Sequence, residues 1–302
     1  MYPPVRLAAI DVDGTLLPSF GSELSRRNLK ALRAAQEAGI QVVIATGRRA
    51  AFAKPLLEGL GLRAEMPLIT SNGAVIRTLG GEPIDRFTLD IEVARGLCAL
   101  LRGYGVLVFT FDQPGRGELV LEDLSRAEGR MELWVEANRE AIEEVSPLQQ
   151  IFESRGAPIQ GMVAGPVARM REAEQAFEAS EWSSRCECLR TEYAARDLAI
   201  LDLLPRGISK GAALERLARR LGIDRLETLA IGDNWNDVDM LEWAGQSFIM
   251  GNAARELRTM AKLRGWKQAP SNDRNGVAVV LEAVIARRPK LAAAQEPEWE
   301  RD

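Results

Sequence analysis

Histidine is absent from this chain of 302 residues. Its absence excludes a Ser-His-Asp triad, a zinc site built on imidazoles, and acid–base catalysis by histidine. Only three cysteines are present, an odd number that does not suggest a disulfide framework. Cys186 and Cys188 form a Cys-x-Cys pair, but Cys98 is the only other thiol, so we interpret them as buried apolar side chains. Any chemistry must therefore use carboxylates, hydroxyls, Lys and Arg, and a hard metal ion is expected.

An excess of positive charge is also absent. The formal net charge is −4, which argues against a nucleic-acid-binding surface. No apolar run reaches the ~18 residues that cross a bilayer, and the start of the chain, residues 1–4, lacks the basic and apolar regions of a secretory signal. We therefore expect a cytoplasmic protein whose partner is a small molecule, not a nucleic acid or a membrane. The sequence gives no indication of oligomeric state.

Both outer parts of the chain alternate strand and helix signals. Apolar runs of strand length occupy 5–10, 42–45 and 67–70, with helical spacing over 24–38 and a helix expected from the turn at 46–48 to about residue 60. The alternation resumes at 209 with a helix over 210–221 and strands over 228–231 and 247–250. Apolar strands that alternate with helices predict a doubly wound, Rossmann-like parallel sheet covered on both faces.

The middle of the chain has a different pattern. Residues 75–89, with Gly80 and Gly81 at their centre, predict a hairpin. The further expected elements are helices over 91–102 and 167–179 and strands over 106–111, 131–135, 159–164, 186–190 and 198–203. We interpret 82–205 as an inserted α+β domain, and 1–81 with 206–302 as the core domain. The charged end, 287–302, has no apolar period and is expected to be a disordered tail.

Polar loops follow the carboxyl ends of the predicted parallel strands, where open α/β sheets place their ligands. Asp11 and Asp13 end the first strand, and extended backbone would bring both carboxylates to one face, about 6–7 Å apart. Two such carboxylates repel unless a cation or a proton separates them. One could attack phosphorus while the other, protonated, donates to the leaving oxygen. The alternative is an Asp/Gly turn without a catalytic role.

Two further loops carry groups that can bind phosphate. In Thr46-Gly47-Arg48, a hydroxyl lies beside free N–H groups at the start of a helix, although an ordinary threonine cap has the same pattern. Lys210 is expected at a helix N-terminus, where the helix dipole disfavours a cation. That position is reasonable if Lys210 neutralises an aspartate or a phosphate, and the alternative is a solvated surface lysine.

The loop after the strand at 228–231 crowds Asp233, Asn236 and Asp237 together. Oxygen ligands of this kind fit Mg²⁺, a hard cation that binds carboxylates, carbonyls and waters. An EF-hand calcium loop does not fit, because no Glu stands at the twelfth position. The alternative is a polar loop with a capping Asp or Asn.

Taken in order, these motifs closely resemble the haloacid dehalogenase superfamily. The matching segments are Asp11-Val12-Asp13-Gly14-Thr15-Leu16, Thr46-Gly47-Arg48, Ser71-Asn72-Gly73-Ala74, Ser209-Lys210-Gly211 and Gly232-Asp233-Asn234-Trp235-Asn236-Asp237. The large insertion after the third strand is similar to the cap of the Cof-type (class IIB) branch of sugar-phosphate phosphatases. The resemblance covers nearly the whole core, whereas the insertion supports it only by position, size and strand content.

The resemblance implies a role for each matching residue. Asp11 would be the nucleophile that forms an aspartyl-phosphate, and Asp13 would protonate the leaving group and later activate water. Mg²⁺ would be held by Asp11, the Asp13 carbonyl and Asp233. The residues implied to contact phosphate or substrate, or to support the metal ligands, are Thr46, Gly47, Arg48, Asn72, Lys210, Asn236 and Asp237.

The implied activity is Mg²⁺-dependent hydrolysis of small phosphomonoesters, such as sugar phosphates. A non-catalytic sugar-phosphate-binding regulator is the rival, although such a protein would be expected to lose one of Asp11, Asp13, Lys210 and Asp233. A phosphomutase usually carries a helical cap inserted earlier. Sucrose-phosphate and mannosyl-phosphoglycerate phosphatases share the architecture and compete as substrate assignments. Large aromatic residues such as Phe111 and Trp134 are interpreted as core, and Trp235 as a packing residue.

Overall fold

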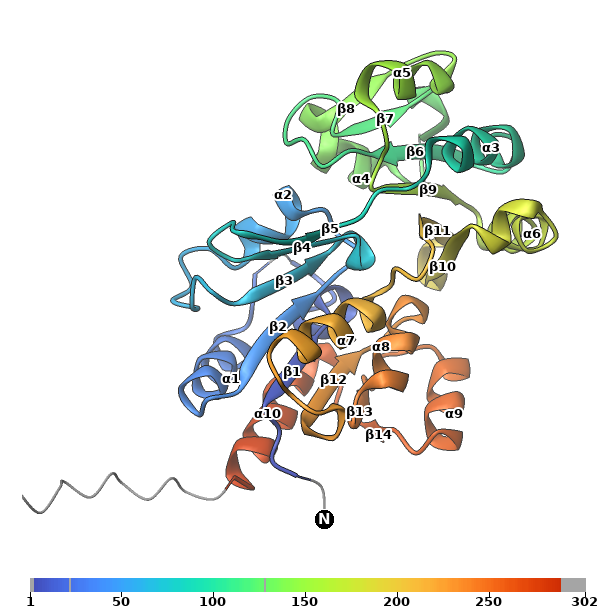
Figure 1. The fold of residues 1–302 in the computed structure, drawn as a ribbon. Coiled ribbons are helices and arrows are strands. Elements are labelled where there is room, and N and C mark those ends of the chain that lie inside the picture. The colour runs from blue at the N-terminus through green and yellow to red at the C-terminus, as the bar shows by residue number, and fades with distance from the viewer. Residues whose placement is uncertain (1–2, 22, 128, 289–302) are drawn as a thin grey trace, which may run out of the picture.

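The computed structural model of the chain describes residues 3–21, 23–127 and 129–288. They form two bodies, each built on one β-sheet, which lie one above the other in Figure 1. We call the lower body, with eight strands, the core domain, and the upper body, with six strands, the cap. Residues 289–302 of the predicted tail lie outside the described residues.

The core sheet has the strand order β14-β13-β12-β1-β2-β3-β4-β5. Its strands are β1 (Leu7–Ile10), β2 (Gln41–Ala45), β3 (Pro67–Thr70), β4 (Val75–Thr78), β5 (Pro83–Arg86), β12 (Thr228–Gly232), β13 (Gln246–Ile249) and β14 (Lys267–Gln268). The strands from β14 to β3 are parallel, and β4 and β5 form an antiparallel hairpin at one edge. The predicted parallel α/β sheet and its hairpin are thus confirmed.

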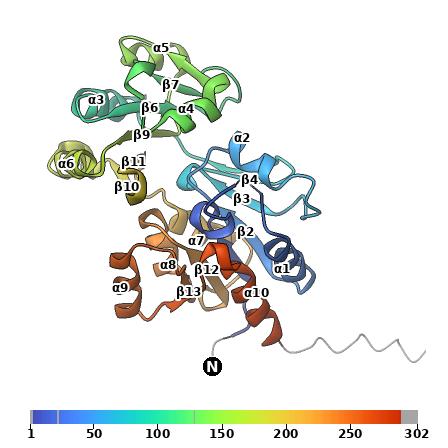
Figure 2. The same ribbon diagram turned by 180° about the vertical axis from the view of Figure 1, so that it is seen from behind.

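Helices cover both faces of this sheet because its central strands are apolar on both sides. In β1, Ala8 and Ile10 pack toward one face, and Leu7 and Ala9 pack toward the other. The first face is covered by α1 (Arg26–Glu37) and α10 (Gly276–Ala286), and the second by α7 (Lys210–Arg220), α8 (Val238–Trp243) and α9 (Arg255–Leu263). Figures 1 and 2 show α1 and α10 side by side. Each fully buried Leu or Ile stabilises the fold by roughly 1.5–3 kcal/mol.

The cap sheet has the strand order β10-β11-β9-β6-β7-β8. Its strands are β6 (Val106–Thr110), β7 (Leu119–Leu121), β8 (Ile142–Glu144), β9 (Gln160–Gly165), β10 (Cys186–Tyr193) and β11 (Leu198–Pro205). One face packs against α3 (Ile91–Leu101), α5 (Ile151–Arg155) and α6 (Val167–Glu178). The other face, which we call the inner face, is partly covered by α4 (Glu132–Asn138). Phe111 lies in the cap core, as predicted.

The prediction of a strand over residues 131–135 is wrong. These residues lead into helix α4, because Met131 and Val135, four residues apart, are buried on one side of the segment while Leu133 is 70% exposed. The short strands β7 and β8 on either side of α4 were not predicted. Three residues of strand carry too little alternation to be distinguished from a loop.

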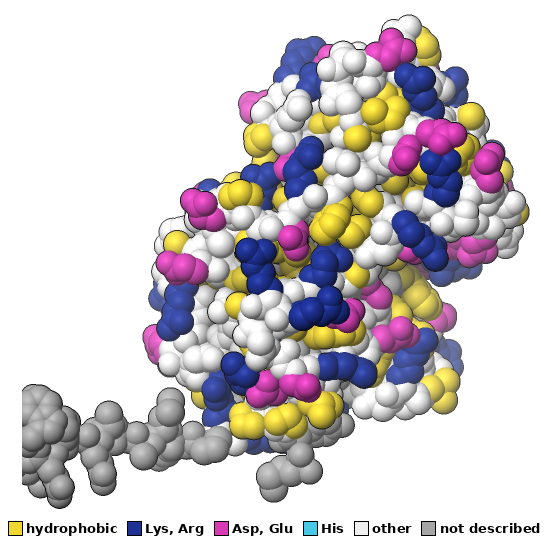
Figure 3. Space-filling model, in the orientation of Figure 1, with side chains coloured by type: hydrophobic (Ala, Val, Ile, Leu, Met, Phe, Trp, Pro, Cys, Tyr) yellow, Lys and Arg dark blue, Asp and Glu magenta, His cyan; other side chains and the backbone are white. Residues whose placement is uncertain are grey.

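The long helix predicted up to residue 60 is also wrong. The structure has only α2 (Ala50–Ala53) followed by a 3-10 turn at Lys54–Leu56. Pro55 has no N–H to donate, so the α-helix is not continued there. No helix in the described ranges is long and apolar enough to cross a membrane. On the face shown in Figure 3, basic and acidic side chains are interspersed.

Candidate active site

Asp11 lies at the carboxyl edge of the core sheet, directly after β1. Its N–H donates to the carbonyl of Ile231 at 3.0 Å, which extends the pairing of β1 with β12. The chain then turns sharply at Gly14, where φ is +78°. A Cβ at this position would lie 2.3 Å from Oδ2 of Asp233, so only glycine allows the two loops to approach this closely.

Lys210 joins two carboxylates from different loops. It is fully buried at the start of α7, and its Nζ donates to Oδ1 of Asp11 and Oδ1 of Asp237, each at 2.7 Å. Burial opposes the charge on Lys210, but the two carboxylates outweigh it and raise the pKa of the ammonium group. Lys210 therefore stays charged and fixes the position of Asp11.

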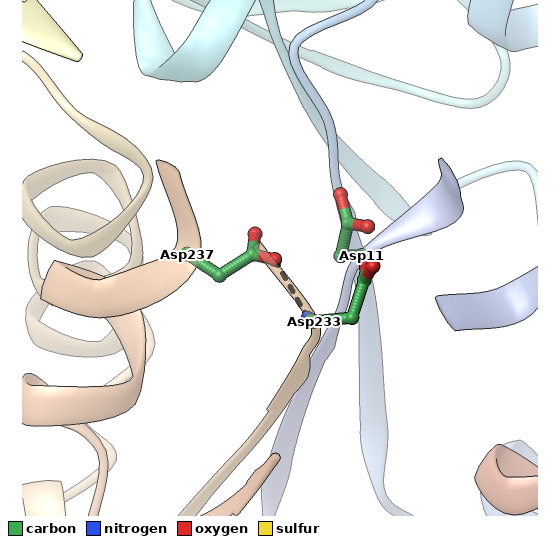
Figure 4. A group of neighbouring side chains, drawn as sticks. All are labelled: Asp11, Asp233 and Asp237. Atoms are coloured by element: carbon green, nitrogen blue, oxygen red, sulfur yellow. Dashed lines mark hydrogen bonds between the residues drawn. The ribbon is translucent and has the colours of Figure 1, made fainter. Parts of the chain in front are cut away.

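Asp237 is held by hydrogen bonds on both carboxylate oxygens. Oδ2 accepts from the N–H groups of Asp233 and Asn234 at 2.9 and 3.0 Å, the first of which is the dashed line in Figure 4. Asp233 in turn accepts at Oδ1 from the Thr15 hydroxyl at 2.9 Å. Among the described residues, Oδ2 of Asp11 and Oδ2 of Asp233 have no donor.

The carboxylates of Asp11, Asp233 and Asp237 together fit a divalent cation. One oxygen from each of Asp11, Asp233 and Asp237 lies within 4.8 Å of the others (Figure 4). Three carboxylates and the ammonium of Lys210 amount to a net charge of −2 when all are ionised. Burial, followed by the neighbouring carboxylates, raises the pKa of Asp11 to about 7 and that of Asp233 well above its usual value. Asp11 and Asp233 would hold the cation, and carboxylate oxygens are ligands that Mg²⁺ prefers.

The Asp13 side chain points to Arg48 and is not part of this carboxylate cluster. Arg48 donates from Nε and Nη2 to the two carboxylate oxygens of Asp13, at 2.7 and 2.5 Å. The Arg48 guanidinium also lies over the Phe52 ring, 4.9 Å from its centroid. The backbone N–H of Arg48 donates to the hydroxyl of buried Thr46 at 3.1 Å. The second predicted loop is thereby placed next to the first.

Asn72 and Asn236 form part of a buried hydrogen-bond chain. Asn236 donates from Nδ2 to Oδ1 of Asn72 at 3.1 Å, and Asn72 donates from Nδ2 to Oδ2 of Asp202 at 2.8 Å. Asp202 belongs to strand β11 of the cap and also accepts from the Gln160 amide. Burial raises the pKa of Asp202 to about 7, although both amide donors act in the opposite direction. Gly47 lies against this chain, because a Cβ there would be 3.1 Å from Asn72.

A cavity of about 230 Å³ lies between these loops and the inner face of the cap. Its core side includes Asp11, Asp13, Gly47, Arg48 and Asn236. Its cap side includes Thr110, Leu119, Trp134, Gln160, Met162, Thr191, Tyr193, Ile200 and Asp202. Of the predicted residues that the structure describes, five do not line the cavity, namely Thr46, Asn72, Lys210, Asp233 and Asp237. All of them except Asp233 form a hydrogen bond with a residue that does.

Arg49 connects the core domain directly to the cap. Its guanidinium pairs with Glu118, and it also donates to Oδ1 of Asn138 at 3.0 and 3.2 Å. Both partners are buried residues of the cap. Sequence reasoning missed Arg49, because nothing distinguishes it from its neighbour Arg48. It also missed Asp202, for which the available signal was a lone carboxylate within the apolar segment Leu198–Leu204.

Comparison with known proteins gives the family of this fold and site. The family model described as haloacid dehalogenase-like hydrolase matches residues 8–281, which includes all four loops and the cap. The chain belongs to the haloacid dehalogenase-like hydrolases. The predicted family is therefore confirmed, and the chain shares its capped fold with a solved sugar phosphatase of subclass IIB.

Similar haloacid dehalogenase-like proteins include phosphatases from Bacillus subtilis strain 168. "Phosphatase YwpJ" is 33% identical, over 93% of this chain and all of the relative. "5-amino-6-(5-phospho-D-ribitylamino)uracil phosphatase YwtE" is 30% identical, over 93% of this chain and 99% of the relative. A solved haloacid dehalogenase-like hydrolase from B. subtilis has a TM-score of 0.75 at 26% identity, over 92% of this chain and 99% of that one. This haloacid dehalogenase-like hydrolase is, like its relatives, a phosphoric monoester hydrolase.

Proposed function

We propose that this hydrolase is a Mg²⁺-dependent phosphatase that cleaves small phosphomonoesters through an aspartyl-phosphate on Asp11. The observation that carries the proposal is the position of Asp11. It lines the cavity, is held by Lys210 at 2.7 Å, and has a carboxylate oxygen that no described residue engages. That is the arrangement of an oriented carboxylate nucleophile.

Two displacements at phosphorus make up the reaction. In the first, a carboxylate oxygen of Asp11 forms a bond to phosphorus as the bond to the leaving oxygen breaks, and Asp13 gives that oxygen a proton. In the second, a water oxygen attacks phosphorus, Asp13 takes the water proton, and the bond to Asp11 breaks to release phosphate. Asp13 must leave its ion pair with Arg48 to carry the first proton.

The surrounding residues would hold the transferred group. Lys210 orients Asp11 and would balance charge on the phosphoryl oxygens. Arg48, released from Asp13, can bind a phosphate oxygen, with Thr46, Gly47 and Asn236 beside it. Mg²⁺ would be held by Asp11, Asp233 and the Asp13 carbonyl, and it would supply positive charge to the phosphoryl group. Asp237 fixes Lys210 and the Asp233 backbone.

The substrate would be a small metabolite phosphate, such as a sugar phosphate or a related compound. The cavity of about 230 Å³ is smaller than the ~300–1,000 Å³ of pockets for drug-sized ligands. One relative is named for a phosphorylated ribitylaminouracil, so a nitrogen-containing leaving group is also within the family's range. The rival function, a non-catalytic regulator, would use the same cavity without turnover.

Phosphate release tests the proposal. Sugar phosphates, nucleotides and para-nitrophenyl phosphate are incubated with wild type and with Asp11→Asn, with EDTA and with Mg²⁺. We expect release that requires Mg²⁺ and is abolished by Asp11→Asn, because the amide cannot form the phosphoenzyme. Turnover retained by Asp11→Asn would refute the covalent route. Binding of phosphate esters without any release would favour the regulator.

A further inference from the structure

Strand β10 brings one residue of the cap to the reacting groups of the core domain. Side chains alternate along a strand, so Thr191 and Tyr193 lie on the same face of β10, and both line the cavity with Asp11 and Asp13. Figures 1 and 2 both show β10 above α8, the helix that follows the loop of Asp233. Tyr193 carries the only phenol among the described residues that line the cavity.

The end of β10 is fixed to the core domain by the side chain of Asn234. Asn234 donates from Nδ2 to the carbonyl of Glu192 and accepts at Oδ1 from the N–H of Glu192, each at 3.3 Å. Earlier on the same strand, the Arg190 guanidinium lies over the Trp235 ring, 5.3 Å from its centroid. Because Glu192 directly precedes Tyr193, the two hydrogen bonds to its backbone fix the point from which the Tyr193 side chain extends.

The hydroxyl of Tyr193 has no hydrogen-bond partner among the described residues. The side chain lines the cavity and is 36% exposed, so a ligand can reach it. Partial removal from water, followed by the negative charges of Asp13, Asp11 and Asp233, raises the pKa of the Tyr193 hydroxyl. The hydroxyl therefore keeps its proton and can donate a hydrogen bond to a ligand.

The direction of attack decides which atom of the substrate this hydroxyl would meet. The attacking and leaving oxygens lie roughly in line through phosphorus. Asp11 attacks from the core domain, so the leaving oxygen lies on the opposite side, toward the cap. Tyr193 belongs to the cap, and the carboxylate whose charge acts on it most strongly is Asp13, the proposed acid for that oxygen. A departing oxygen gains negative charge, which a donor beside it stabilises.

We propose that the Tyr193 hydroxyl donates a hydrogen bond to the leaving oxygen as its bond to phosphorus breaks, and that Asn234 is the positioning residue that holds Tyr193 there. The leaving oxygen still receives its proton from Asp13, and Tyr193 keeps its own throughout. This rests on the proposed phosphatase function and adds to it a catalytic residue that the cap supplies.

Aryl phosphates that differ only in the para substituent test this contact. The panel is para-nitrophenyl, phenyl and para-methoxyphenyl phosphate, in order of rising basicity of the leaving oxygen, each with Mg²⁺. Tyr193→Phe should reduce kcat/KM by about 100-fold for the methoxy ester, because a basic oxygen depends most on a donor, and by much less for the nitro ester, whose ring spreads the charge. An equal loss for all three esters, or no loss, would overturn the proposal.

Tyr104→Phe is the matched control, because it removes the same hydroxyl from another tyrosine of the cap. Tyr104 lies beside Arg169, whose guanidinium is 4.7 Å from the ring centroid, and it does not line the cavity. This variant should keep the wild-type kcat/KM for every ester. Thermal unfolding of both variants checks that each is folded, and equal losses in the two would show that the effect of Tyr193→Phe is not local.

A double-mutant cycle tests the role of Asn234. Asn234→Ala removes both hydrogen bonds to Glu192, so it should show the same dependence on the leaving oxygen as Tyr193→Phe. The combined variant should lose less than the sum of the two, because the second change removes a contact that the first has already disturbed. Additive losses, or a loss from Asn234→Ala that is equal for all three esters, would overturn the assignment of Asn234.

The wild-type rates separate this proposal from the proposed function. Mg²⁺-dependent hydrolysis that Tyr193→Phe leaves unchanged overturns the role of Tyr193 and leaves the phosphatase proposal intact. If only a metabolite ester is hydrolysed, its analogue with sulfur as the leaving atom replaces the nitro ester, and Tyr193→Phe should slow the oxygen ester more. No Mg²⁺-dependent hydrolysis of any ester overturns both proposals.

Discussion

Replacing Gly14 by alanine should disable the site through the position of Asp233 alone. The added Cβ would lie 2.3 Å from Oδ2 of Asp233, whereas such contacts are essentially never closer than 3.0 Å. The carboxylate must therefore shift by at least 0.7 Å, the difference between the two distances. A misplacement of about 1 Å near the chemistry can reduce the rate by about 100-fold.

Gly14→Ala would also strain the backbone, and this effect must be distinguished from the contact with Asp233. Gly14 has φ of +78°, and an L-residue in that region is destabilised by roughly 1–2 kcal/mol. Gly59 provides the matched control, because its φ is +71° and an added Cβ would have no neighbour within 4 Å. Both alanine variants should therefore lose a similar amount of stability, and only Gly14→Ala should lose activity and Mg²⁺ affinity.

The assays are urea unfolding for stability, calorimetric titration for Mg²⁺, and kcat/KM on the best ester. We expect Gly14→Ala to fall by about 100-fold in kcat/KM and Gly59→Ala to stay near wild type. If both variants lose activity equally, general strain explains the loss. If Gly14→Ala remains fully active, Asp233 does not need its present position, and the assigned metal site is refuted.

Three further predictions concern charge. In protein freed of metal, Mg²⁺ at about 100 times its Kd should stabilise the fold by about 2.7 kcal/mol. Because Asp11, whose pKa is raised to about 7, must lose its proton to bind metal, Mg²⁺ should raise Tm more at pH 8 than at pH 6, and a larger rise at pH 6 would contradict this. The fold raises the pKa of Asp202 from 3.8 to about 7, so its neutral form contributes at most ~4 kcal/mol to the free energy of unfolding. This contribution is complete below pH 4 and is lost as pH rises through 7. Between pH 5 and pH 8, urea unfolding should show a smaller drop in stability for Asp202→Asn than for wild type, and an equal drop would refute the assignment. Arg49→Met leaves Glu118 buried without its partner and should destabilise the protein by about 3–5 kcal/mol, and adding Glu118→Gln should recover most of that; no recovery in the double variant would show that the pair is not coupled.

The loops of the core domain were predictable because the information is local. Asp11, Thr46 and Asp233 each follow an apolar strand, and parallel strands bring their carboxyl ends to one edge. The sequence could not show that Asp13 would pair with Arg48 in this state, because rotamers depend on the surrounding charges. The metal site remains a proposal. The positions of the Asp11 and Asp233 carboxylates, and the hydrogen bonds to Asp237 that support them, agree with the predicted ligands.

The cap side was not predictable in the same way. Asp202 meets Asn72 only because the cap docks on the core domain, and it meets Gln160 only through the register of β11 on β9. No local sequence pattern predicts either of these two contacts of Asp202. Trp134 was interpreted as a core residue of a strand, but it lies on a helix, half-buried, where it lines the cavity. Long-range pairing thus decides the substrate-facing surface, while short motifs decide the chemistry.

Arg48 and Arg49 are neighbours along the chain that serve opposite bodies of the molecule. One side chain holds Asp13, and the next reaches Glu118 and Asn138 in the cap. If the cap lifts, Arg49 loses its partners in the cap, and Arg49 is joined by one peptide bond to the residue that holds Asp13. One peptide unit therefore joins the arginine that holds the cap to the arginine that holds Asp13, the proposed acid, so movement of the cap would be expected to affect both contacts.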